Sequence, residues 1–277
     1  MGASKLVLSL LVAAVLLHVA VTLRISAFNI KCFGKTKMNK TEVANNIVKI
    51  VERYDITLVQ EVRDKNLDVV NKLKEMLNSS ISGLYKFNYS APLGQSNYKE
   101  RYLFIYKNDS VTLRMTRQMG RMGVFSRPPY VVKFYSPNTQ VKEFVMVPLH
   151  SKPDNAVKEI DKLYDVYNDI RTAWKNDNII LLGDFNAGCG YVNKSDWSKI
   201  RLHTQAHCDW LIKDDDDTTV TAGRHCPYDR IVVCGNDLKN DVEPGSGKIY
   251  NFTLAFNLTN KKALEVSDHF PVEMVLT

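Results

Sequence analysis

The strongest constraint on the fold is an alternation of short apolar runs with amphipathic helical segments between residues 23 and 276. Strand-like apolar runs stand at 23–30, 56–60, 102–106, 130–135, 143–149, 178–182, 230–234 and 271–276. Apolar residues at helical spacing predict helices over 41–54, 67–77 and 157–174. Strands outnumber helices and the two kinds interleave, which predicts an α/β fold with sheets covered by helices.

The N-terminal residues 1–22 have the pattern of a secretory signal peptide. Lys5 supplies a basic residue, residues 6–19 are almost wholly apolar, and small residues follow near a cleavage point. A membrane anchor is the alternative, but the apolar stretch is short for a span and contains Ser9 and His18. We expect cleavage, secretion through the endoplasmic reticulum, and no stable membrane insertion of the mature chain. No repeat, low-complexity tract or Pro/Gly-rich linker divides residues 23–277, which predicts one domain.

The charge of the chain agrees with a polyanionic partner without requiring one. The formal net charge is +7 for 277 residues, and a positive surface concentrates polyanions near a protein. Many soluble proteins carry a similar charge, so this argument is weak by itself. Asn-x-Ser/Thr sequons, which predict glycan on surface loops of a secreted chain, stand at Asn39, Asn78, Asn88, Asn108, Asn193, Asn251 and Asn257.

The cysteines of the predicted mature chain are odd in number. They are Cys32, Cys189, Cys208, Cys226 and Cys234. At least one is therefore free or paired between chains. So few cysteines do not make a small disulfide scaffold, so we expect a large core to hold the fold, with one bridge pinning a loop.

Acidic, amide and imidazole side chains gather at the ends of the strand-like runs. Those at or just past the end of a run are Asn29, Glu61, His150 and Asp184, and those just before a run are Glu100, Asp229, Asp268 and His269. If the strands run in mixed directions, both groups can meet along one edge, where sites are usually built. Most strands end in polar residues, so the pattern has weight only because all eight come from these four residue types.

These residue types suit the cleavage of a phosphodiester. Such an anion requires charge neutralisation, a base that deprotonates water and an acid for the leaving alkoxide. Mg²⁺ binds carboxylate and amide oxygens, and histidines oriented by carboxylates can exchange protons near neutral pH. The chain has no Gly-x-Ser-x-Gly elbow, Walker loop, His-Glu-x-x-His helix or Cys-x-x-Cys pair.

The segments around these residues resemble the deoxyribonuclease I family of the endonuclease/exonuclease/phosphatase superfamily. The resemblance runs from about residue 23 to residue 276, and its segments are 27–30, 58–64, 98–102, 147–150, 183–189, 226–230 and 267–269. It implies a four-layer α/β sandwich, with two packed mixed β-sheets flanked by helices. It also implies an endonuclease that cleaves DNA with little sequence specificity, using Mg²⁺ and Ca²⁺, with Mn²⁺ able to substitute.

The resemblance also implies roles for individual residues. The metal ligands would be Asn29, Glu61, Asp184 and Asp268. The general acid and base would be His150 paired with Glu100 and His269 paired with Asp229, in an order that stays open. Residues in contact with DNA would be Arg63, Tyr98, Arg127 and Tyr191, with Asn186 on the scissile phosphate. Cys189 and Cys226 would form a disulfide, whereas Cys32, Cys208 and Cys234 have no predicted partner and are expected to be small buried residues.

Some features are weaker or depart from the family pattern. Asp217, Thr219 and Thr221 resemble a calcium loop of the family, and a solvated loop is the alternative. The basic segment 114–127 replaces a short cysteine-bridged loop of the pancreatic type and resembles the gamma type more. Residues 87–89 stand where the pancreatic enzyme binds actin, and Asn88 lies in a sequon, so we expect no tight actin binding.

Three functions remain open on the sequence alone. The first is a secreted, monomeric deoxyribonuclease, which the basic surface and Arg63 favour. The second is a phosphodiesterase of the same superfamily that acts on a lipid or a small phosphoester. The third is a non-catalytic binding protein, but such a protein should lack one of the ligands or histidines above, and none is missing.

Overall fold

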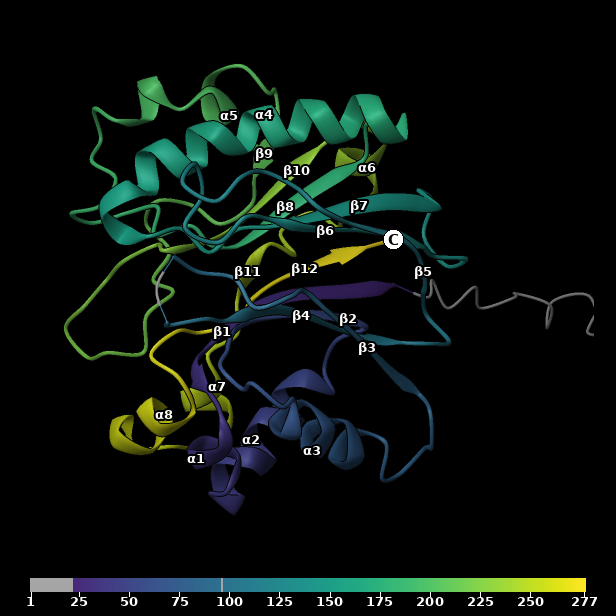
Figure 1. Cartoon of the computed structure of the whole chain (residues 1–277), viewed down its shortest axis with the longest axis vertical. Coiled ribbons are helices and arrows are strands. Elements are labelled where there is room, and N and C mark those ends of the chain that lie inside the picture. The colour runs from purple at the N-terminus through teal and green to yellow at the C-terminus, as the bar shows by residue number, and fades with distance from the viewer. Residues whose placement is uncertain (1–21, 96) are drawn as a thin grey trace, which may run out of the picture.

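Two six-stranded β-sheets pack face to face in the computed structural model, which describes residues 22–95 and 97–277 (Figure 1). The first sheet has the order β11 (Lys248–Ile249), β12 (Val272–Leu276), β1 (Leu23–Phe33), β2 (Ile56–Val62), β4 (Arg101–Lys107), β3 (Tyr85–Tyr89). The second has the order β5 (Thr112–Gln118), β6 (Tyr130–Tyr135), β7 (Glu143–Pro148), β8 (Ile179–Asp184), β10 (Asp229–Cys234), β9 (Asp209–Trp210). The predicted signal segment lies, apart from Thr22, outside the described residues, and its cleavage stays a prediction.

Both sheets are mixed, which brings strand ends of opposite sense to one edge. The strand pairs β1–β2 and β7–β8 are parallel, and the other neighbours are antiparallel. The C-terminal ends of β1 and β2 therefore lie beside the starts of β4 and β12. In the second sheet the ends of β7 and β8 lie beside the start of β10. We call this side of the sandwich the catalytic edge.

Helices cover the outer faces of both sheets and complete the predicted four layers (Figure 1). The helices over the first sheet are α1 (Lys35–Met38), α2 (Thr41–Val51), α3 (Asp68–Leu77), α7 (Phe252–Ala255) and α8 (Asn260–Val266). Those over the second are α4 (Ala156–Trp174) and α5 (Arg201–Thr204), and α6 (Asn236–Asp241) follows β10. Short 3₁₀ turns are η1 (Pro153–Asn155) and η2 (Trp197–Lys199).

The sheets are buried on both faces, which explains why their strands read as continuous apolar runs. In β8, Ile180 and Leu182 face the other sheet, while Ile179 and Leu181 pack toward α4. Successive side chains of a strand point to opposite faces, so a strand between two apolar layers needs apolar residues at every position. The predicted α/β class and the helices at 41–54, 67–77 and 157–174 are confirmed as α2, α3 and α4.

Two strands run further than the sequence indicated. β1 continues to Phe33 and β2 to Val62, so Asn29 and Glu61 lie inside strands and not at or just past their ends. The hydrogen-bond register shifts between Asn29 and Phe33 and again between Val59 and Val62. Glu61 has a positive φ of 58°. Such irregularities re-aim a side chain at a sheet edge, and an apolar pattern does not record them.

The structure contains two disulfides where one was predicted. Cys189–Cys226 is confirmed, and Cys208–Cys234 is a second bridge between two cysteines for which the sequence indicated no partner. Cys32 is free, as the odd number requires, but it is exposed and not a small core residue. Among residues 22–95 and 97–277, no helix combines the length and apolar character needed to cross a bilayer.

Candidate active site

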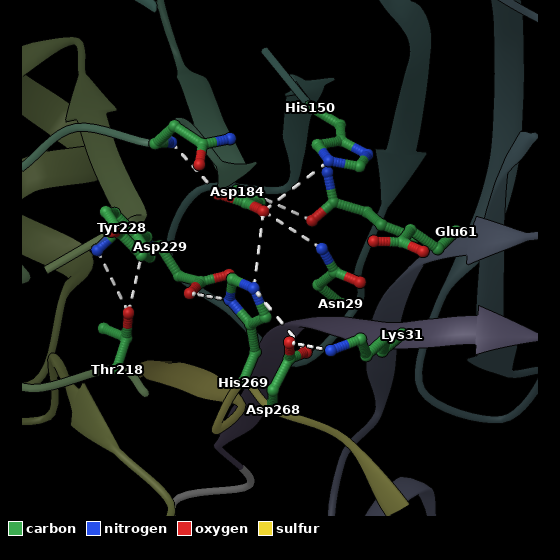
Figure 2. A network of polar contacts seen from close by, with 12 residues as sticks. Asn29, Lys31, Glu61, His150, Asp184, Thr218, Tyr228, Asp229, Asp268 and His269 are labelled. Carbon is green, nitrogen blue, oxygen red and sulfur yellow. Dashed lines mark hydrogen bonds and ion pairs between the residues drawn. The ribbon is translucent and has the colours of Figure 1, made fainter. Parts of the chain in front are cut away.

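The eight polar residues predicted from the strand ends come together at the catalytic edge, and both sheets contribute to them. Figure 2 labels all of them except Glu100. Each histidine–carboxylate pair is divided between the sheets. His150 follows β7 of the second sheet, and Glu100 directly precedes β4 of the first. His269 precedes β12 of the first sheet, and Asp229 begins β10 of the second. The site therefore exists only when the two sheets are packed together.

The first pair is His150 with Glu100. His150 Nδ1 lies 2.5 Å from Glu100 Oε1, and Arg127 Nε lies 2.6 Å from the same oxygen. The backbone N–H of His150 donates to the Tyr102 hydroxyl at 2.9 Å. Burial opposes ionisation of both partners, but their mutual attraction outweighs it. The pKa of Glu100 is lowered by His150 and Arg127, and the pKa of His150 is raised by Glu100.

The second pair is His269 with Asp229. His269 Nδ1 lies 2.7 Å from Asp229 Oδ2, and Asp229 is fully buried. The Thr218 hydroxyl oxygen accepts the backbone N–H groups of Tyr228 and Asp229 at 3.1 and 3.2 Å. Burial alone would lower the pKa of His269, but Asp229 and Asp184 outweigh burial and raise it to about 10.

Both imidazoles direct their second ring nitrogen at one carboxylate oxygen. His150 Nε2 lies 3.6 Å from Asp184 Oδ2, and His269 Nε2 lies 3.7 Å from the same atom (Figure 2). Because Nδ1 of each ring is held by a carboxylate, Nε2 is the nitrogen available for proton exchange. The arrangement presents two such nitrogens to one small volume.

A buried amide holds Asp184 in place. Gln60 is fully buried, accepts the backbone N–H of Asp184 at 2.9 Å and donates to the carbonyl of Leu149 at 2.8 Å. A Cβ at Gly183, which has a φ of 126°, would lie 2.4 Å from that same carbonyl oxygen, so only glycine fits. The sequence argument missed Gln60, although an amide inside an apolar run next to Glu61 is a usable signal.

Unpaired oxygens at the site fit a hard divalent cation. Within residues 22–95 and 97–277, Asn29 Oδ1 and Asp268 Oδ1 are buried and accept no hydrogen bond. Glu61 accepts the backbone N–H of Cys32 through one oxygen, at 2.8 Å. The ammonium of Lys31 lies 2.5 Å from Asp268 Oδ2, so that oxygen already has a partner and Oδ1 is the one without. Buried acceptors without partners are rare, and carboxylate and amide oxygens are the ligands that Mg²⁺ and Ca²⁺ prefer.

A second group of potential metal ligands shares only Asp184 with the four predicted ligands. One ligand atom from each of Asp184, Asp229 and His269 lies within 4.8 Å of the others. The His269–Asp229 hydrogen bond and the approach of His269 Nε2 to Asp184 account for this proximity without a cation. The oxygens without partners therefore point to the cation site better than the proximity does.

The five predicted substrate residues differ in their surroundings. The guanidinium of Arg63 lies over the ring of Tyr98 and donates to its hydroxyl, and both residues line a cavity of about 450 Å³. Tyr191 is exposed and packs on Tyr228, which packs on His269. Arg127 and Asn186 are held inside the site instead. Arg127 pairs with Glu100, and Asn186 is buried and donates to the Ser151 carbonyl at 3.1 Å.

The predicted calcium loop is closed by its own hydrogen bonds. Asp217 Oδ1 accepts the N–H and hydroxyl of Thr219 and the N–H of Cys226. The other oxygen of Asp217 lies 3.3 Å from His225 Nδ1. Thr221 accepts the N–H of Arg224. The loop leads through Thr218 to Asp229, so its conformation affects the second histidine pair.

Comparison with known proteins agrees with this geometry. Residues 26–269 match the model of the endonuclease/exonuclease/phosphatase family. The chain is 51% identical to Deoxyribonuclease-1 of Gallus gallus over 279 residues, covering 99% of both chains. It is 49% identical to Deoxyribonuclease-1 of Equus caballus over 282 residues, covering all of both chains. It is 45% identical to Deoxyribonuclease gamma of Mus musculus over 281 residues, covering 99% of this chain and 91% of that protein.

Solved structures share the fold at low sequence identity. A humanised D. rerio TDP2 superposes with a TM-score of 0.66 at 13% identity, covering 92% of this chain and 99% of the other. The mannosyl-6-phosphatase Bt3783 of Bacteroides thetaiotaomicron gives a TM-score of 0.62 at 14% identity, covering 92% of this chain and all of the other. Full-length identity near one half, the family match and the paired histidines agree: the chain belongs to the deoxyribonuclease I family of endonuclease/exonuclease/phosphatase proteins.

Proposed function

We propose that this chain is a secreted, divalent-metal-dependent endonuclease that hydrolyses phosphodiester bonds of DNA with little sequence preference. The observation that carries the proposal is the convergence of His150 Nε2 and His269 Nε2 on Asp184, each ring braced by a buried carboxylate. Hydrolysis of a diester needs a proton acceptor and a proton donor on opposite sides of one phosphorus. Two oriented imidazoles meet that need.

In the proposed reaction the two histidines hold opposite protonation states. The neutral imidazole accepts a proton from the attacking water at Nε2. The protonated imidazole donates its Nε2 proton to the oxygen that leaves phosphorus. Glu100 and Asp229 keep Nδ1 protonated and fix the ring orientation, as carboxylates do for catalytic histidines. The order of the two roles stays open, because both rings have a raised pKa and both face Asp184.

Asn29, Glu61, Asp184 and Asp268 would hold the catalytic cation. Mg²⁺ is the ion that their oxygens suit best, with Mn²⁺ as a substitute. When bound, the cation neutralises the charge of the phosphate and of the leaving oxygen. Asn186 would orient the scissile phosphate beside it. The loop with Asp217, Thr219 and Thr221 would take Ca²⁺, a structural role supported by its link through Thr218 to Asp229.

Substrate contacts are assigned to residues around the catalytic edge. Arg63, stacked on Tyr98, fits insertion into the minor groove, where the potential is most negative. Tyr191 would contact the DNA backbone near His269, and Arg127 would contact it near His150. Contacts of this kind read phosphates and groove shape and not base edges, so sequence preference is slight.

The remaining assignments concern the biology of the chain. The signal pattern in residues 1–22, the sequons and the two disulfides support secretion through the endoplasmic reticulum. We propose a monomer without tight actin binding. Asn88 lies on β3, an edge strand, where a glycan would obstruct a docking protein.

A plasmid assay tests the function directly. Secreted recombinant protein is incubated with supercoiled plasmid in Mg²⁺, Ca²⁺, both, or chelator, and in parallel with phosphatidylinositol phosphates and a sugar phosphate. We expect nicking and then linearisation of plasmid in divalent cation, with none in chelator. Turnover of the lipid or sugar phosphate, with plasmid left intact, would contradict the proposal and favour a phosphodiesterase of small substrates.

A further inference from the structure

A long stretch of the chain contains cations and no acids. Residues 110–142 lack Asp and Glu and carry Arg114, Arg117, Arg121, Arg127, Lys133 and Lys142. Three of these cations are engaged, namely Arg127 with Glu100, Lys133 with Glu143, and Lys142 with the carbonyl of Pro137. The other three, Arg114, Arg117 and Arg121, are exposed, and we call them the arginine stripe. Within residues 22–95 and 97–277 they form no ion pair.

The stripe follows β5, which is the outermost strand of the second sheet (Figure 1). Arg117 lies opposite Val131, whose side chain packs toward α4, so Arg117 projects from the same outer face of the sheet. The guanidinium of Arg114 lies 5.0 Å from the ring centre of Tyr135, on that same face. β5 runs from Arg114 through Arg117 and continues into the loop that contains Arg121.

The loop that contains Arg121 lies at the catalytic edge. β6 begins where β7 ends, because the two strands are antiparallel, so the β5–β6 connection lies beside His150. Phe125 is buried, and Ser126 donates to Glu159 at 2.7 Å, which anchors the loop just before Arg127 reaches Glu100. Arg121, Gly123 and the residues between them stay exposed. The stripe therefore begins in the loop that reaches His150 through Arg127, and it extends away from His150 along β5.

The fold itself does not need these charges. β5 is held by backbone pairing with β6, and its residues from Arg114 to Gln118 are exposed. Like charges on one exposed strand repel one another and stabilise nothing unless a counter-charge arrives. Guanidinium groups match phosphate oxygens in pairs, and a linear array of phosphates is the simplest linear counter-charge.

We infer that the arginine stripe is a second DNA-contacting surface, which grips phosphates of the duplex outside the cleavage site. The inference rests on the proposed function and extends it to the length of DNA engaged. The step from Arg114 to Arg117 along β5 spans roughly 10 Å, which corresponds to about three phosphates along one DNA strand measured on the helix axis, and Arg121 lies beyond β5 in the loop. The stripe contributes to binding long duplexes and adds nothing to the chemical step at the scissile phosphate.

Charge reversal with a matched control tests this surface. The test variant is Arg117→Glu/Arg121→Glu. The control is Lys142→Glu/Lys175→Glu, which makes the same change in net charge at a cavity on the opposite edge of the sandwich. Each protein is assayed for binding of a fluorescent 30-base-pair duplex in chelator, for cleavage of that duplex, and for hydrolysis of bis(4-nitrophenyl) phosphate. Circular dichroism and thermal melting check folding, and Arg117→Gln/Arg121→Gln serves as a milder second variant.

The expected result is a loss that depends on salt and on DNA length. The test variant should bind the long duplex at least tenfold more weakly than the control, and the slope of log Kd against log salt should fall by about 2, close to one per lost phosphate contact. Hydrolysis of the small diester should be unchanged. Equal duplex binding and equal salt slopes for test and control variants would overturn the inference, while duplex cleavage by the wild type would leave the proposed function standing. Duplex binding that depends on the stripe, without any cleavage in Mg²⁺, would contradict the proposed function and support the inference.

Discussion

The two histidine–carboxylate pairs have the same geometry but are supported differently. Glu100 is shared between His150 and Arg127, so the charge of this pair is balanced by a cation. Among the residues that the structure describes, no arginine or lysine pairs with Asp229, its second oxygen is buried without a hydrogen-bond partner, and the Thr218 hydroxyl accepts its backbone N–H. His269 correspondingly has a pKa raised to about 10. The two histidine–carboxylate pairs therefore differ in the charges that surround the carboxylate, and nearby charge is one of the causes that shift a pKa.

Removing either imidazole should have the largest effect. His150→Ala and His269→Ala should each lower kcat on plasmid by roughly 10²-fold or more, since general acid–base catalysis contributes about that much. The fold should persist, which circular dichroism checks. If one variant nicked plasmid at the wild-type rate, the corresponding pair would have no part in the reaction.

A substitution at the cation site should change the Mg²⁺ concentration that cleavage requires. Glu61→Gln removes a charged oxygen and should raise the Mg²⁺ concentration for half-maximal cleavage by at least about tenfold. Glu75→Gln, an exposed carboxylate on α3, is the matched control. An unchanged Mg²⁺ titration for the Glu61 variant would count against its role as a ligand.

Replacing Arg127 removes the cation beside Glu100, so the surroundings of the first histidine–carboxylate pair become more like those of the second. The cation of Arg127 lowers the pKa of His150, so Arg127→Met should raise that pKa further. The limb of the pH–rate profile that His150 controls should then move to higher pH, whether its neutral or its protonated form is the active one. Arg127→Lys keeps the charge and should keep the limb in place. A shift toward lower pH in the methionine variant would show that the cation does not set the pKa of this pair.

Removal of a disulfide should have the smallest effect on activity among these changes. Only one of the two removals should affect the pair of His269 and Asp229. Cys189–Cys226 closes the loop that leads to Thr218 and Asp229, whereas Cys208–Cys234 ties a segment beside β9. In the chain-entropy account, loss of either bridge costs about 3–4 kcal/mol of stability. Cys189→Ser/Cys226→Ser should also lower kcat and protease resistance near Asp229, while Cys208→Ser/Cys234→Ser should lower stability alone. Equal kcat values in both variants would refute the link between the first bridge and His269.

The sequence predicted the layers well because burial leaves a pattern. Strands packed on both faces, such as β8, appear as unbroken apolar runs, and α2 and α4 show helical spacing. Strands that are partly or wholly exposed leave no such pattern, which is why β3, β5 and the two-residue strands β9 and β11 were not predicted. The bulges that place Asn29 and Glu61 were missed for another reason: they depend on pairing with neighbouring strands, which a local apolar pattern does not record.

The sequence predicted which residue types form the site, but not all of the bonds that its side chains make. Carboxylates and histidines at strand ends indicated the chemistry, and the family resemblance supplied the pairs. The sharing of Glu100 with Arg127 was not predicted, because Arg127 was assigned to DNA. Gln60 bonds to segments 89 and 124 residues away, and Cys208 and Cys234 meet only after β9 pairs with β10. Contacts of that kind follow from the packed sheets and not from local sequence.

The central claim is that both imidazoles act on one phosphate, and a double-mutant comparison tests it most directly. Single-turnover cleavage of plasmid is measured for wild type, His150→Ala, His269→Ala and the variant with both substitutions. The account predicts that the double variant cleaves at close to the rate of the slower single variant, since residues that act as a unit are far from additive. A rate reduced by the product of the two single losses would contradict it, because the two histidines would then contribute independently.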